Sequence, residues 1–337
     1  MDIQKNKSLK EYNTFGIDCK ARYFTSVKTI DQLKMVLKNE DHQARFVLGG
    51  GSNILFTKDI NELVIHIGLK GITIIDENHE FVTIEVMAGE NWHEFVLFCI
   101  DNDYGGIENL SLIPGNVGAA PIQNIGAYGV ELKDVFESCK ALSIETLSER
   151  IFSNEDCRFD YRNSIFKSEE KGNYIITSVT FRLTKKDHKK NIAYGAIKQM
   201  LEKKNILNPT LKDISDTVIQ IRCSKLPDPK EMGNSGSFFK NPVLNAYDFN
   251  QFIDQNPEAP YYQLPDSYFK IPAGWLIEKA GFKGKKYGNA GVHKDQALVL
   301  VNYGNANGDE IRDLAYLIQG EIKKIFGIII EPEVNII

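Results

Sequence analysis

The sequence predicts a mixed α/β protein built from two or three domains. The chain has 337 residues, and at roughly 150 residues per domain this length corresponds to two or three domains. Hydrophobic residues make up 42% and charged residues 25%, as in ordinary globular proteins, which excludes a disordered chain, a collagen and a coiled-coil rod. Helical and strand-like hydrophobic patterns alternate along the chain, so both kinds of element are expected.

Short elements alternate through the first part of the chain. Apolar residues at helical spacing predict helices over Ile30–Leu37 and Trp92–Ile100. Apolar or alternating runs predict strands over Arg45–Leu48, Ile54–Phe56, Leu63–Ile67 and Phe81–Val86.

The composition changes between Gly105 and Gly129, where glycine, alanine, proline and asparagine dominate and Glu108 is the only charged residue. Strand patterns return near Ala141–Ile144 and over Tyr174–Leu183. The remainder is mixed, with helices expected over Ala193–Lys204 and Leu211–Cys223, a linker at 205–210 and a final apolar strand at Ile328–Ile330.

Charge and motif spacing exclude several classes of protein. Forty basic against forty-five acidic residues give a net charge of −5, which disfavours nucleic-acid binding. The polar N-terminus lacks a signal-peptide core, and no apolar stretch reaches the roughly 18 residues of a membrane span. The five cysteines are odd in number and form no C-x-x-C, and the six histidines lack zinc-site spacing. We therefore expect no metal, no disulfide framework and a reducing, cytoplasmic compartment.

A first glycine run, Gly49, Gly50 and Gly51 followed by Ser52 and Asn53, comes after a predicted strand. Glycines in this position often bring backbone N–H groups close to a phosphate. Neither common nucleotide fingerprint fits, because G-x-G-x-x-G would need glycine at position 54 and a Walker A loop would need G-K-[ST]. A tight turn between strands and a phosphate-binding loop both stay open.

A second glycine stretch, Ile113–Gly129, is long, uncharged and rich in small residues. It favours close approach of the backbone to a large, flat ligand such as a dinucleotide. The N–H dipoles of the backbone can bind the pyrophosphate of such a ligand. The alternative is a glycine-rich crossing of two backbones. Across both stretches the candidate cofactor-binding residues are Gly49, Gly50, Gly51, Ser52, Asn53, Pro114, Gly115, Gly118, Ala119, Gln123, Asn124, Gly126 and Ala127.

Several long motifs carry a resemblance to a known family. They run in order from Asn13 to the C-terminus and include Leu48–Phe56, Ile113–Gly129, Tyr161–Lys167, Lys225–Pro229, Gly236–Pro242, Ala273–Glu278, His293–Asn302 and Glu331–Val334. The chain resembles the UDP-N-acetylenolpyruvoylglucosamine reductases, also called UDP-N-acetylmuramate dehydrogenases or MurB enzymes, of peptidoglycan precursor synthesis. The resemblance implies that NADPH gives a hydride to FAD, and that UDP-N-acetylglucosamine enolpyruvate then receives a hydride at C3 and a proton at C2.

The resemblance also implies the fold, an α+β architecture with a vanillyl-alcohol-oxidase (PCMH) type FAD-binding fold. Two α/β lobes would bind FAD, and a third α+β domain would bind substrate. The expected divisions are residues 1–70 with a returning strand at 329–337, then 71–202, then 203–328. No histidine or cysteine is clearly placed as a tether, so noncovalent FAD is expected. The implied enzyme is a cytoplasmic monomer without nucleic-acid or membrane partners.

Three residues match the catalytic positions of the family. The resemblance implies that Ser237 donates the proton to C2, that Arg162 holds the substrate carboxylate, and that Glu333 hydrogen-bonds the developing enolate. Without the resemblance, the residues favour a serine in a turn and a solvated glutamate, and they leave open whether Arg162 makes only a surface ion pair.

Further residues match substrate-binding positions. The segment around Tyr194 is similar to the tyrosine-bearing loop of type I members, which closes over the substrate diphosphate. Arg222 matches a position near the flavin or the carboxylate. Taken alone, the tyrosines are equally compatible with partial burial, and the polar side chains with solvation. The candidate substrate-binding residues are Tyr161, Tyr194, Lys225, Asn241, Tyr262 and Gln296.

Two other functions stay open at this point. An FAD-dependent alcohol or sugar oxidase of the same fold would pass electrons to oxygen and need no NADPH. A non-catalytic nucleotide-sugar-binding protein would hold no flavin. The set of Ser237, Arg162 and Glu333 argues against both.

Overall fold

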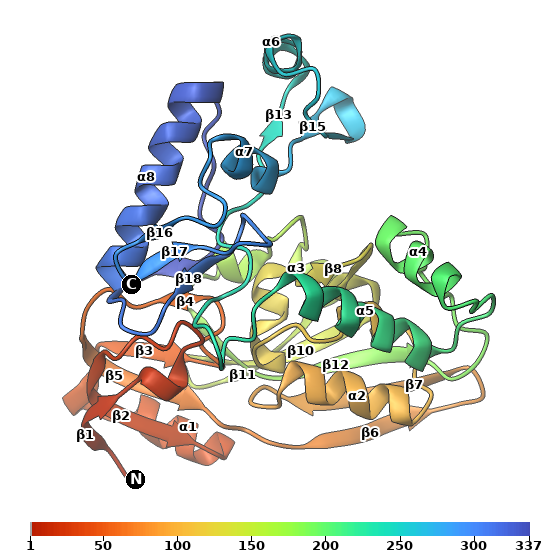
Figure 1. Cartoon of the computed structure of the whole chain (residues 1–337). Helices are drawn as coiled ribbons and strands as arrows, with labels where there is room; N and C mark the ends of the chain where they lie inside the picture. The colour runs from red at the N-terminus through yellow and green to blue at the C-terminus, as the bar shows by residue number, and fades with distance from the viewer. Residues whose placement is uncertain (1) are drawn as a thin grey trace. The chain divides into compact units, whose positions relative to one another are not determined.

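The computed structural model describes residues 2–337, which form two compact units (Figure 1). Unit 1 contains the chain up to Lys7, Ala21–Gly50 and Ile60–Arg222. Unit 2 contains Ser8–Lys20, Gly51–Asp59 and Cys223–Ile337. The chain therefore gives two short segments to unit 2 before its C-terminal part completes that unit. The three-domain division expected from the sequence stays a prediction.

Unit 1 begins with a four-stranded sheet of order β1-β2-β5-β3, in which β2 and β3 run parallel to β5. Helix α1 (Ile30–Leu37) begins after Thr29, whose hydroxyl accepts a hydrogen bond from the Gln32 N–H at 3.1 Å. Its buried face has the helical spacing seen in the sequence. The strands are β1 (Gln4–Ser8), β2 (Lys20–Val27), β3 (Arg45–Leu48) and β5 (Ile60–Ile67).

A second sheet of unit 1 has order β11-β10-β12-β7-β6 and is antiparallel throughout. Its strands are β6 (Ile72–Glu77), β7 (Phe81–Met87), β10 (Phe136–Ser143), β11 (Glu149–Ser153) and β12 (Tyr174–Thr184). Short elements complete this part of the unit: β8 (Gly126–Ala127), β9 (Val130–Glu131) and α3 (Asn154–Cys157).

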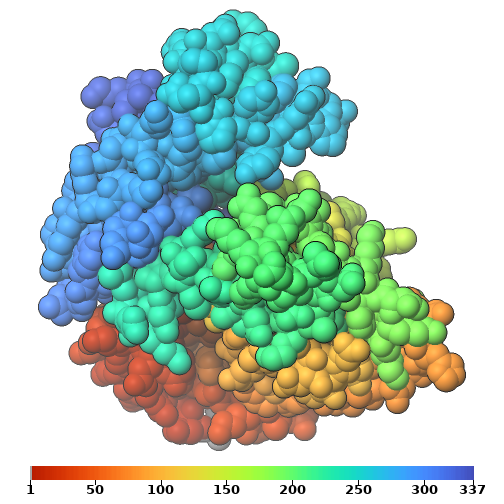
Figure 2. Space-filling view, turned by 45° about the vertical axis from the view of Figure 1, so that its right-hand side comes forward, coloured from red at the N-terminus to blue at the C-terminus, as the bar shows by residue number. Residues whose placement is uncertain are grey.

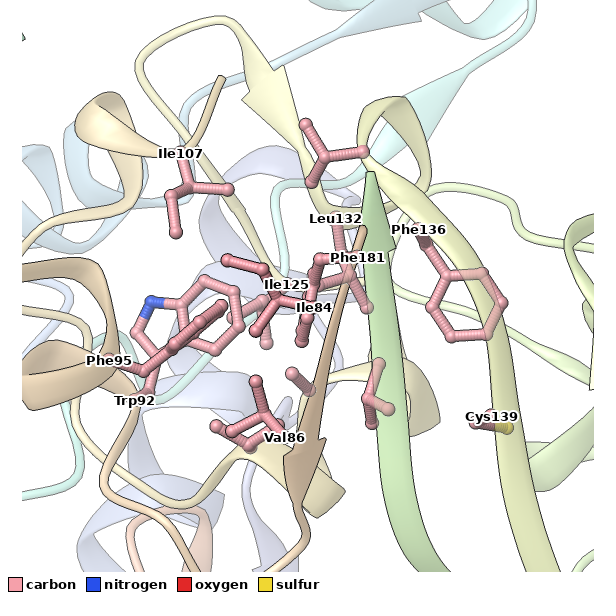
Figure 3. Close-up of a cluster of buried hydrophobic side chains, with 14 of the residues drawn as sticks. Ile84, Val86, Trp92, Phe95, Ile107, Ile125, Leu132, Phe136, Cys139 and Phe181 are labelled. Atoms are coloured by element: carbon pink, nitrogen blue, oxygen red, sulfur yellow. The ribbon is translucent and has the colours of Figure 1, made fainter. Parts of the chain in front are cut away.

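The main core of unit 1 lies between this second sheet and helix α2 (Trp92–Asp101). Figure 3 shows Trp92 and Phe95 of α2 among side chains of the sheet, including Ile84, Val86 and Phe181. The ring centroids of Phe95 and Phe181 are 4.8 Å apart, and all five side chains are almost fully buried. Each such side chain contributes about 1.5–3 kcal/mol by leaving water, so this core fixes the segments that enter and leave α2.

Helices α4 (Gly195–Lys203) and α5 (Leu211–Lys225) pack on each other around a small apolar cluster of their own. Figures 1 and 2 show this green segment beside the orange segment that contains α2. The hydroxyls of Ser111 and Ser215 are 2.8 Å apart and join α5 to the chain that follows α2. The cluster consists of Ile197, Leu201, Ile214, Val218 and Ile221, with Tyr128 packed against it.

Unit 2 combines short strands with helices. The long helix α8 (Gly308–Phe326) starts with a capping box between Asn307 and Glu310, and Gly327 follows it with φ 69°. None of the helices in residues 2–337 has the length and hydropathy that crossing a membrane requires. The other elements are the parallel pair β4 (Ile54–Leu55) and β19 (Asn335–Ile336), β13 (Val243–Leu244), α6 (Ala246–Gln255), β14 (Tyr262–Gln263), β15 (Phe269–Lys270), α7 (Ala273–Lys279), β16 (Lys286–Tyr287), β17 (Ala290–Val292) and β18 (Leu300–Asn302).

Most elements expected from local patterns are confirmed, but the strand expected at Ile328–Ile330 is wrong. Ile328 and Ile330 are buried, whereas Ile329 is 62% exposed. The Ile330 carbonyl accepts a hydrogen bond from Gln319 Nε2 of α8 at 2.7 Å. The run is therefore apolar because Ile328 and Ile330 are buried. The Ile330 carbonyl is bonded by a side chain of α8, where a neighbouring strand was expected to be its partner.

Glu85 on β7 makes the stability of unit 1 sensitive to acid. Its carboxylate accepts a hydrogen bond from Ser178 Oγ at 2.6 Å and lies 2.7 Å from Lys140 Nζ. Burial opposes ionisation, but these hydrogen bonds and the charge of Lys140 outweigh it and lower the pKa of Glu85. Because the folded-state pKa lies below the unfolded value, the stabilisation is present at neutral pH and is lost as pH falls through the folded pKa.

We expect Glu85→Gln to lower the free energy of unfolding by about 1 kcal/mol at neutral pH, since Lys140 is partly solvated. This difference should shrink as pH falls below the unfolded glutamate pKa of about 4.3. Thermal unfolding across a pH series measures it. The control is Glu77→Gln, whose carboxylate is 54% exposed in its ion pair with Lys185 and should matter little at any pH. A Glu85→Gln difference that stays constant in acid would contradict the assignment.

Candidate active site

The first glycine run turns the chain from β3 towards β4. A Cβ at Gly50 would lie 2.8 Å from Asn116 Oδ1, and a Cβ at Gly51, where φ is 59°, would collide with the Tyr12 carbonyl. At Gly49, apart from its two chain neighbours, no residue of the described chain has a heavy atom within 4 Å of the position a Cβ would take. Neighbouring segments therefore leave no room for a side chain at Gly50 and Gly51, whereas Gly49 presents an open backbone face.

The second glycine stretch crosses the turn between β7 and α2. The Gly118 N–H donates to the Ala88 carbonyl at 3.0 Å, and a side chain at Gly118 would collide with Ala88. The glycine-rich backbone crossing is thus confirmed at this position. The stretch still has an uncharged outer face, where Pro114 and Ala119 are exposed. The other candidates here, apart from Asn124, are half-buried: Gly115, Gln123, Gly126 and Ala127.

Asn124 fastens the second stretch from within. It is 1% exposed and has φ 43°, in the left-handed region. Its Nδ2 donates to Glu131 Oε2 at 3.0 Å and to the Asp160 carbonyl at 3.2 Å, and its Oδ1 accepts the Lys133 N–H at 3.1 Å. Because the amide is committed to the protein, a contact of Asn124 with a cofactor would use its backbone.

Arg162 lies at the tip of a tight turn in unit 1. Asp160 and Asn163 exchange two backbone hydrogen bonds of 3.1 Å, with Tyr161 and Arg162 between them. Arg162 has φ 54°, a conformation that costs a non-glycine residue about 1–2 kcal/mol. Its Nη2 donates to the Gly126 carbonyl at 2.9 Å. Strained backbone held in this way is common at functional positions, and it brings Arg162 to the second glycine stretch.

Ser237 and Glu333 come together in unit 2 although they are far apart in the sequence. The Glu333 N–H donates to the Phe238 carbonyl at 2.8 Å, which sets its backbone beside the residue after Ser237. Phe238 is fully buried, whereas Ser237 is exposed and Glu333 half-buried. Asn53 Nδ2 donates to the Glu333 carbonyl at 3.2 Å. The end of the first glycine run therefore reaches the same place, with Ser52 half-buried next to it.

The two predicted substrate-binding amides meet at the start of α7 in unit 2. Asn241 Oδ1 accepts a hydrogen bond from the Ala273 N–H at 2.9 Å. Gln296 Oε1 lies 3.4 Å from the position a Cβ would take at Gly274. The structure thus gathers Asn241 and Gln296 at one helix end.

Two further predicted residues of unit 2 are exposed. Tyr262 is 53% exposed on β14, and Lys270 Nζ on the paired strand β15 lies 5.9 Å from its ring centroid. Lys225 ends α5 and is also exposed. Both side chains are accessible to a ligand.

Tyr194 directly precedes α4 in unit 1 and is 46% exposed. Its ring meets the ring of Tyr128 edge to face, with the centroids 5.4 Å apart. Arg222, expected near the flavin or the carboxylate, donates a hydrogen bond to the Tyr128 hydroxyl. Tyr128 was not among the residues predicted from the sequence, where its one signal is an aromatic side chain within a stretch of small ones.

Two histidines, His93 and His293, accept hydrogen bonds from backbone N–H groups. Burial lowers the pKa of His293, whose Nδ1 accepts the Asp295 N–H at 3.4 Å. Burial and then the charge of Arg222 lower the pKa of His93, whose Nδ1 accepts the Leu112 N–H at 3.0 Å. Within residues 2–337 no three His, Cys, Asp or Glu side chains gather closely enough to share a metal ion.

Comparison with known proteins gives consistent relatives. A family model described as UDP-N-acetylenolpyruvoylglucosamine reductase, C-terminal domain, matches residues 228–337, and a model of an FAD binding domain matches residues 21–148. A UDP-N-acetylenolpyruvoylglucosamine reductase of Flavobacterium johnsoniae is 58% identical over 100% of both chains. Proteins of that name from Amoebophilus asiaticus and Pseudomonas aeruginosa are 49% and 44% identical, over 100% of this chain and 100% and 99% of theirs.

A solved structure supports the architecture. The crystal structure of UDP-N-acetylenolpyruvylglucosamine reductase (MurB) from Thermus caldophilus aligns with a TM-score of 0.68 over 100% of this chain and 99% of that one. The two chains are 22% identical, so this likeness concerns the fold alone. Together with the matched FAD-binding and C-terminal domains, it confirms the fold expected from the sequence.

Proposed function

The chain belongs to the UDP-N-acetylenolpyruvoylglucosamine reductase (MurB) family, and we propose from this membership that it reduces UDP-N-acetylglucosamine enolpyruvate to UDP-N-acetylmuramate. The observation that carries the proposal is the 58% identity to a reductase of that name over the whole length of both chains. The enzyme is a flavin-dependent oxidoreductase of peptidoglycan precursor synthesis that uses FAD and NADPH.

The two glycine stretches fit FAD. Gly49 has an open backbone face, and the exposed Pro114 and Ala119 belong to a stretch without charged side chains. N–H dipoles, and not lysines, would therefore meet the pyrophosphate. Residues 49–53 and 114–127 would hold the cofactor, and the matched FAD binding domain covers both. The chemistry that bound FAD supplies is hydride transfer, from NADPH and then to C3 of the enolpyruvyl group.

Ser237 supplies the proton at C2. An alcohol is a weak acid, so its hydroxyl gives up the proton only to a strongly basic carbon such as C2 after hydride addition at C3. Because Ser237 is exposed, the alkoxide left behind can recover a proton from solvent.

Arg162 and Glu333 stabilise the charge that develops before that proton arrives. A guanidinium binds a carboxylate with two parallel hydrogen bonds, so Arg162 orients the enolpyruvyl carboxylate and offsets its growing charge. We assign to Glu333, which is half-buried beside the Ser237 segment, a hydrogen bond to the developing enolate.

We propose that the remaining candidate residues bind the nucleotide-sugar end of the substrate. We assign the phosphates and the sugar to Lys225, Asn241 and Gln296, and ring contacts to Tyr161 and Tyr262. We place the chain with the type I members, because Tyr194 stands exposed before α4 and can close over the diphosphate. We also propose a cytoplasmic monomer. The odd number of cysteines supports a reducing compartment, and light scattering tests the monomer.

An anaerobic absorbance spectrum of the FAD-loaded protein tests the function in two additions. NADPH should bleach the flavin, and UDP-N-acetylglucosamine enolpyruvate should then restore its colour. A flavin that NADPH leaves yellow, or that oxygen alone restores, would indicate an oxidase. A protein that cannot take up FAD at all would leave only a nucleotide-sugar-binding role.

A further inference from the structure

Tyr128 has a strained backbone that two asparagine side chains hold in place. Its φ is 51°, and a non-glycine residue pays about 1–2 kcal/mol for this conformation. The fully buried Asn109 donates through Nδ2 to the Tyr128 carbonyl at 3.0 Å and to the Asn191 carbonyl at 2.8 Å. Asn191 Nδ2 in turn donates to the Gly129 carbonyl at 2.7 Å. These bonds clamp the second glycine stretch to the segment that leads into Tyr194.

The ring of Tyr128 is the fixed member of an aromatic pair. It packs against the apolar cluster of α4 and α5, and among the described members of that cluster it alone comes from outside residues 192–221. Tyr194 meets it edge to face at 5.4 Å and is itself 46% exposed. Tyr128 is thus anchored on both backbone and ring, and Tyr194 is the more exposed member of the pair.

The hydroxyl of Tyr128 is anchored as well. Arg222, in the last part of α5, donates a hydrogen bond to it, and a guanidinium can only donate. Burial raises the pKa of Tyr128, so its hydroxyl stays neutral beside that charge. Backbone, ring and hydroxyl therefore all fix the face that Tyr128 presents to Tyr194.

We propose that Tyr128 is a positioning residue for Tyr194, and that Arg222 acts through the Tyr128 hydroxyl to hold the docking ring in orientation. The inference rests on the proposed role of Tyr194 in closing over the substrate diphosphate. A docked Tyr194 is preorganised beside the second glycine stretch, whereas an undocked one must be ordered when substrate binds. Loss of the dock should therefore weaken substrate binding and leave hydride transfer from NADPH unchanged.

The test measures binding of UDP-N-acetylglucosamine enolpyruvate to the oxidised, FAD-loaded enzyme by the change in flavin absorbance. Tyr128→Leu removes the ring and should weaken binding about 2- to 12-fold, the range of one edge-to-face aromatic pair. Tyr128→Phe and Arg222→Met each break the same hydrogen bond and should weaken it by equal, smaller factors. The double variant Tyr128→Phe/Arg222→Met should bind no more weakly than either single variant. Bleaching of Tyr128→Leu and Tyr128→Phe at saturating NADPH should stay within about twofold of the unsubstituted enzyme.

Tyr23→Phe is the matched control, because Tyr23 is also half-buried with an arginine, Arg22, 5.5 Å from its ring, and it should bind normally. Multiplying losses in the double variant would show that Arg222 acts on the ligand directly and would overturn the inference. Unchanged or tighter binding by Tyr128→Leu would overturn it too. If that variant fails to load FAD, Tyr128→Phe, Arg222→Met and their double variant still test the docking role.

Tyr194→Leu distinguishes the docking role of Tyr128 from the proposal that Tyr194 closes over the substrate diphosphate. If Tyr194→Leu weakens binding and Tyr128→Leu does not, only the docking role fails. If Tyr194→Leu also binds normally, the tyrosine-loop assignment itself is wrong.

Discussion

Replacement of Ser237 by alanine should slow the reduction of the enolpyruvyl substrate by about 10³- to 10⁴-fold while NADPH still bleaches the flavin at nearly the normal rate. This loss corresponds to about 4 to 5 kcal/mol of the activation barrier. The two half-reactions separate because a proton donor to C2 has no part in the first hydride transfer. Anaerobic stopped-flow absorbance of the flavin measures each half-reaction in turn.

Two variants of the same loop sharpen the test. Ser235→Ala also removes a hydroxyl, but Ser235 is 8% exposed and its Oγ has no hydrogen-bond partner within residues 2–337, so little should change. Ser237→Cys keeps a proton donor of similar size and should recover part of the rate. Equal losses in both half-reactions of Ser237→Ala, or a comparable loss in Ser235→Ala, would point to a disturbed loop and not to a missing proton donor.

Local hydrophobic patterns in the sequence predicted the elements whose buried residues are close neighbours along the chain. Helix α1 has the expected bounds, because Leu33, Val36 and Leu37 form one buried face. Strand β2 was not expected, because Phe24 and the polar Thr25 are both buried and interrupt the alternation that begins at Lys20. Polar residues buried inside a sheet thus remove the signal on which a local pattern depends.

The candidate site depends on contacts between distant segments, which local patterns do not describe. Glu333 pairs with Phe238, and β19 pairs with β4, through backbone hydrogen bonds whose register no periodicity fixes. The family resemblance, and not the hydrophobic pattern, brought Ser237 and Glu333 into one proposal. The structure adds an independent reason, since Asn53 from the first glycine run bonds to Glu333.

Side chains that fasten the glycine stretches were the least predictable feature. Asn124 and Tyr128 both have positive φ, a conformation that glycine signals in a sequence and other residues do not. Asn109 has an ordinary sequence context, yet it bonds to two segments far apart in the chain. The sequence therefore indicated where a backbone approaches a ligand, and the structure was needed to show what holds that backbone.

Arg162→Met should slow the second half-reaction by about 10²- to 10³-fold, the range found when one group that stabilises developing negative charge is removed. Bleaching by NADPH should stay nearly unchanged. Arg162→Lys should fall between this variant and the unsubstituted enzyme, because lysine keeps the charge but cannot form two parallel hydrogen bonds. The bond from Arg162 to the Gly126 carbonyl would also be lost in Arg162→Met. Stopped-flow absorbance again separates the half-reactions.

Arg158→Met is the control, because Arg158 also has a left-handed backbone, at φ 45°, but pairs with Glu169 at 3.0 Å on the surface and should be dispensable. The methyl ester of the substrate then separates charge recognition from general disruption. The unsubstituted enzyme should prefer the free acid to the ester, and Arg162→Met should reduce both at similar rates. If Arg162→Met kept the full preference for the acid, the carboxylate would have another partner, because a residue that acts on this charge must lose its effect once the charge is removed.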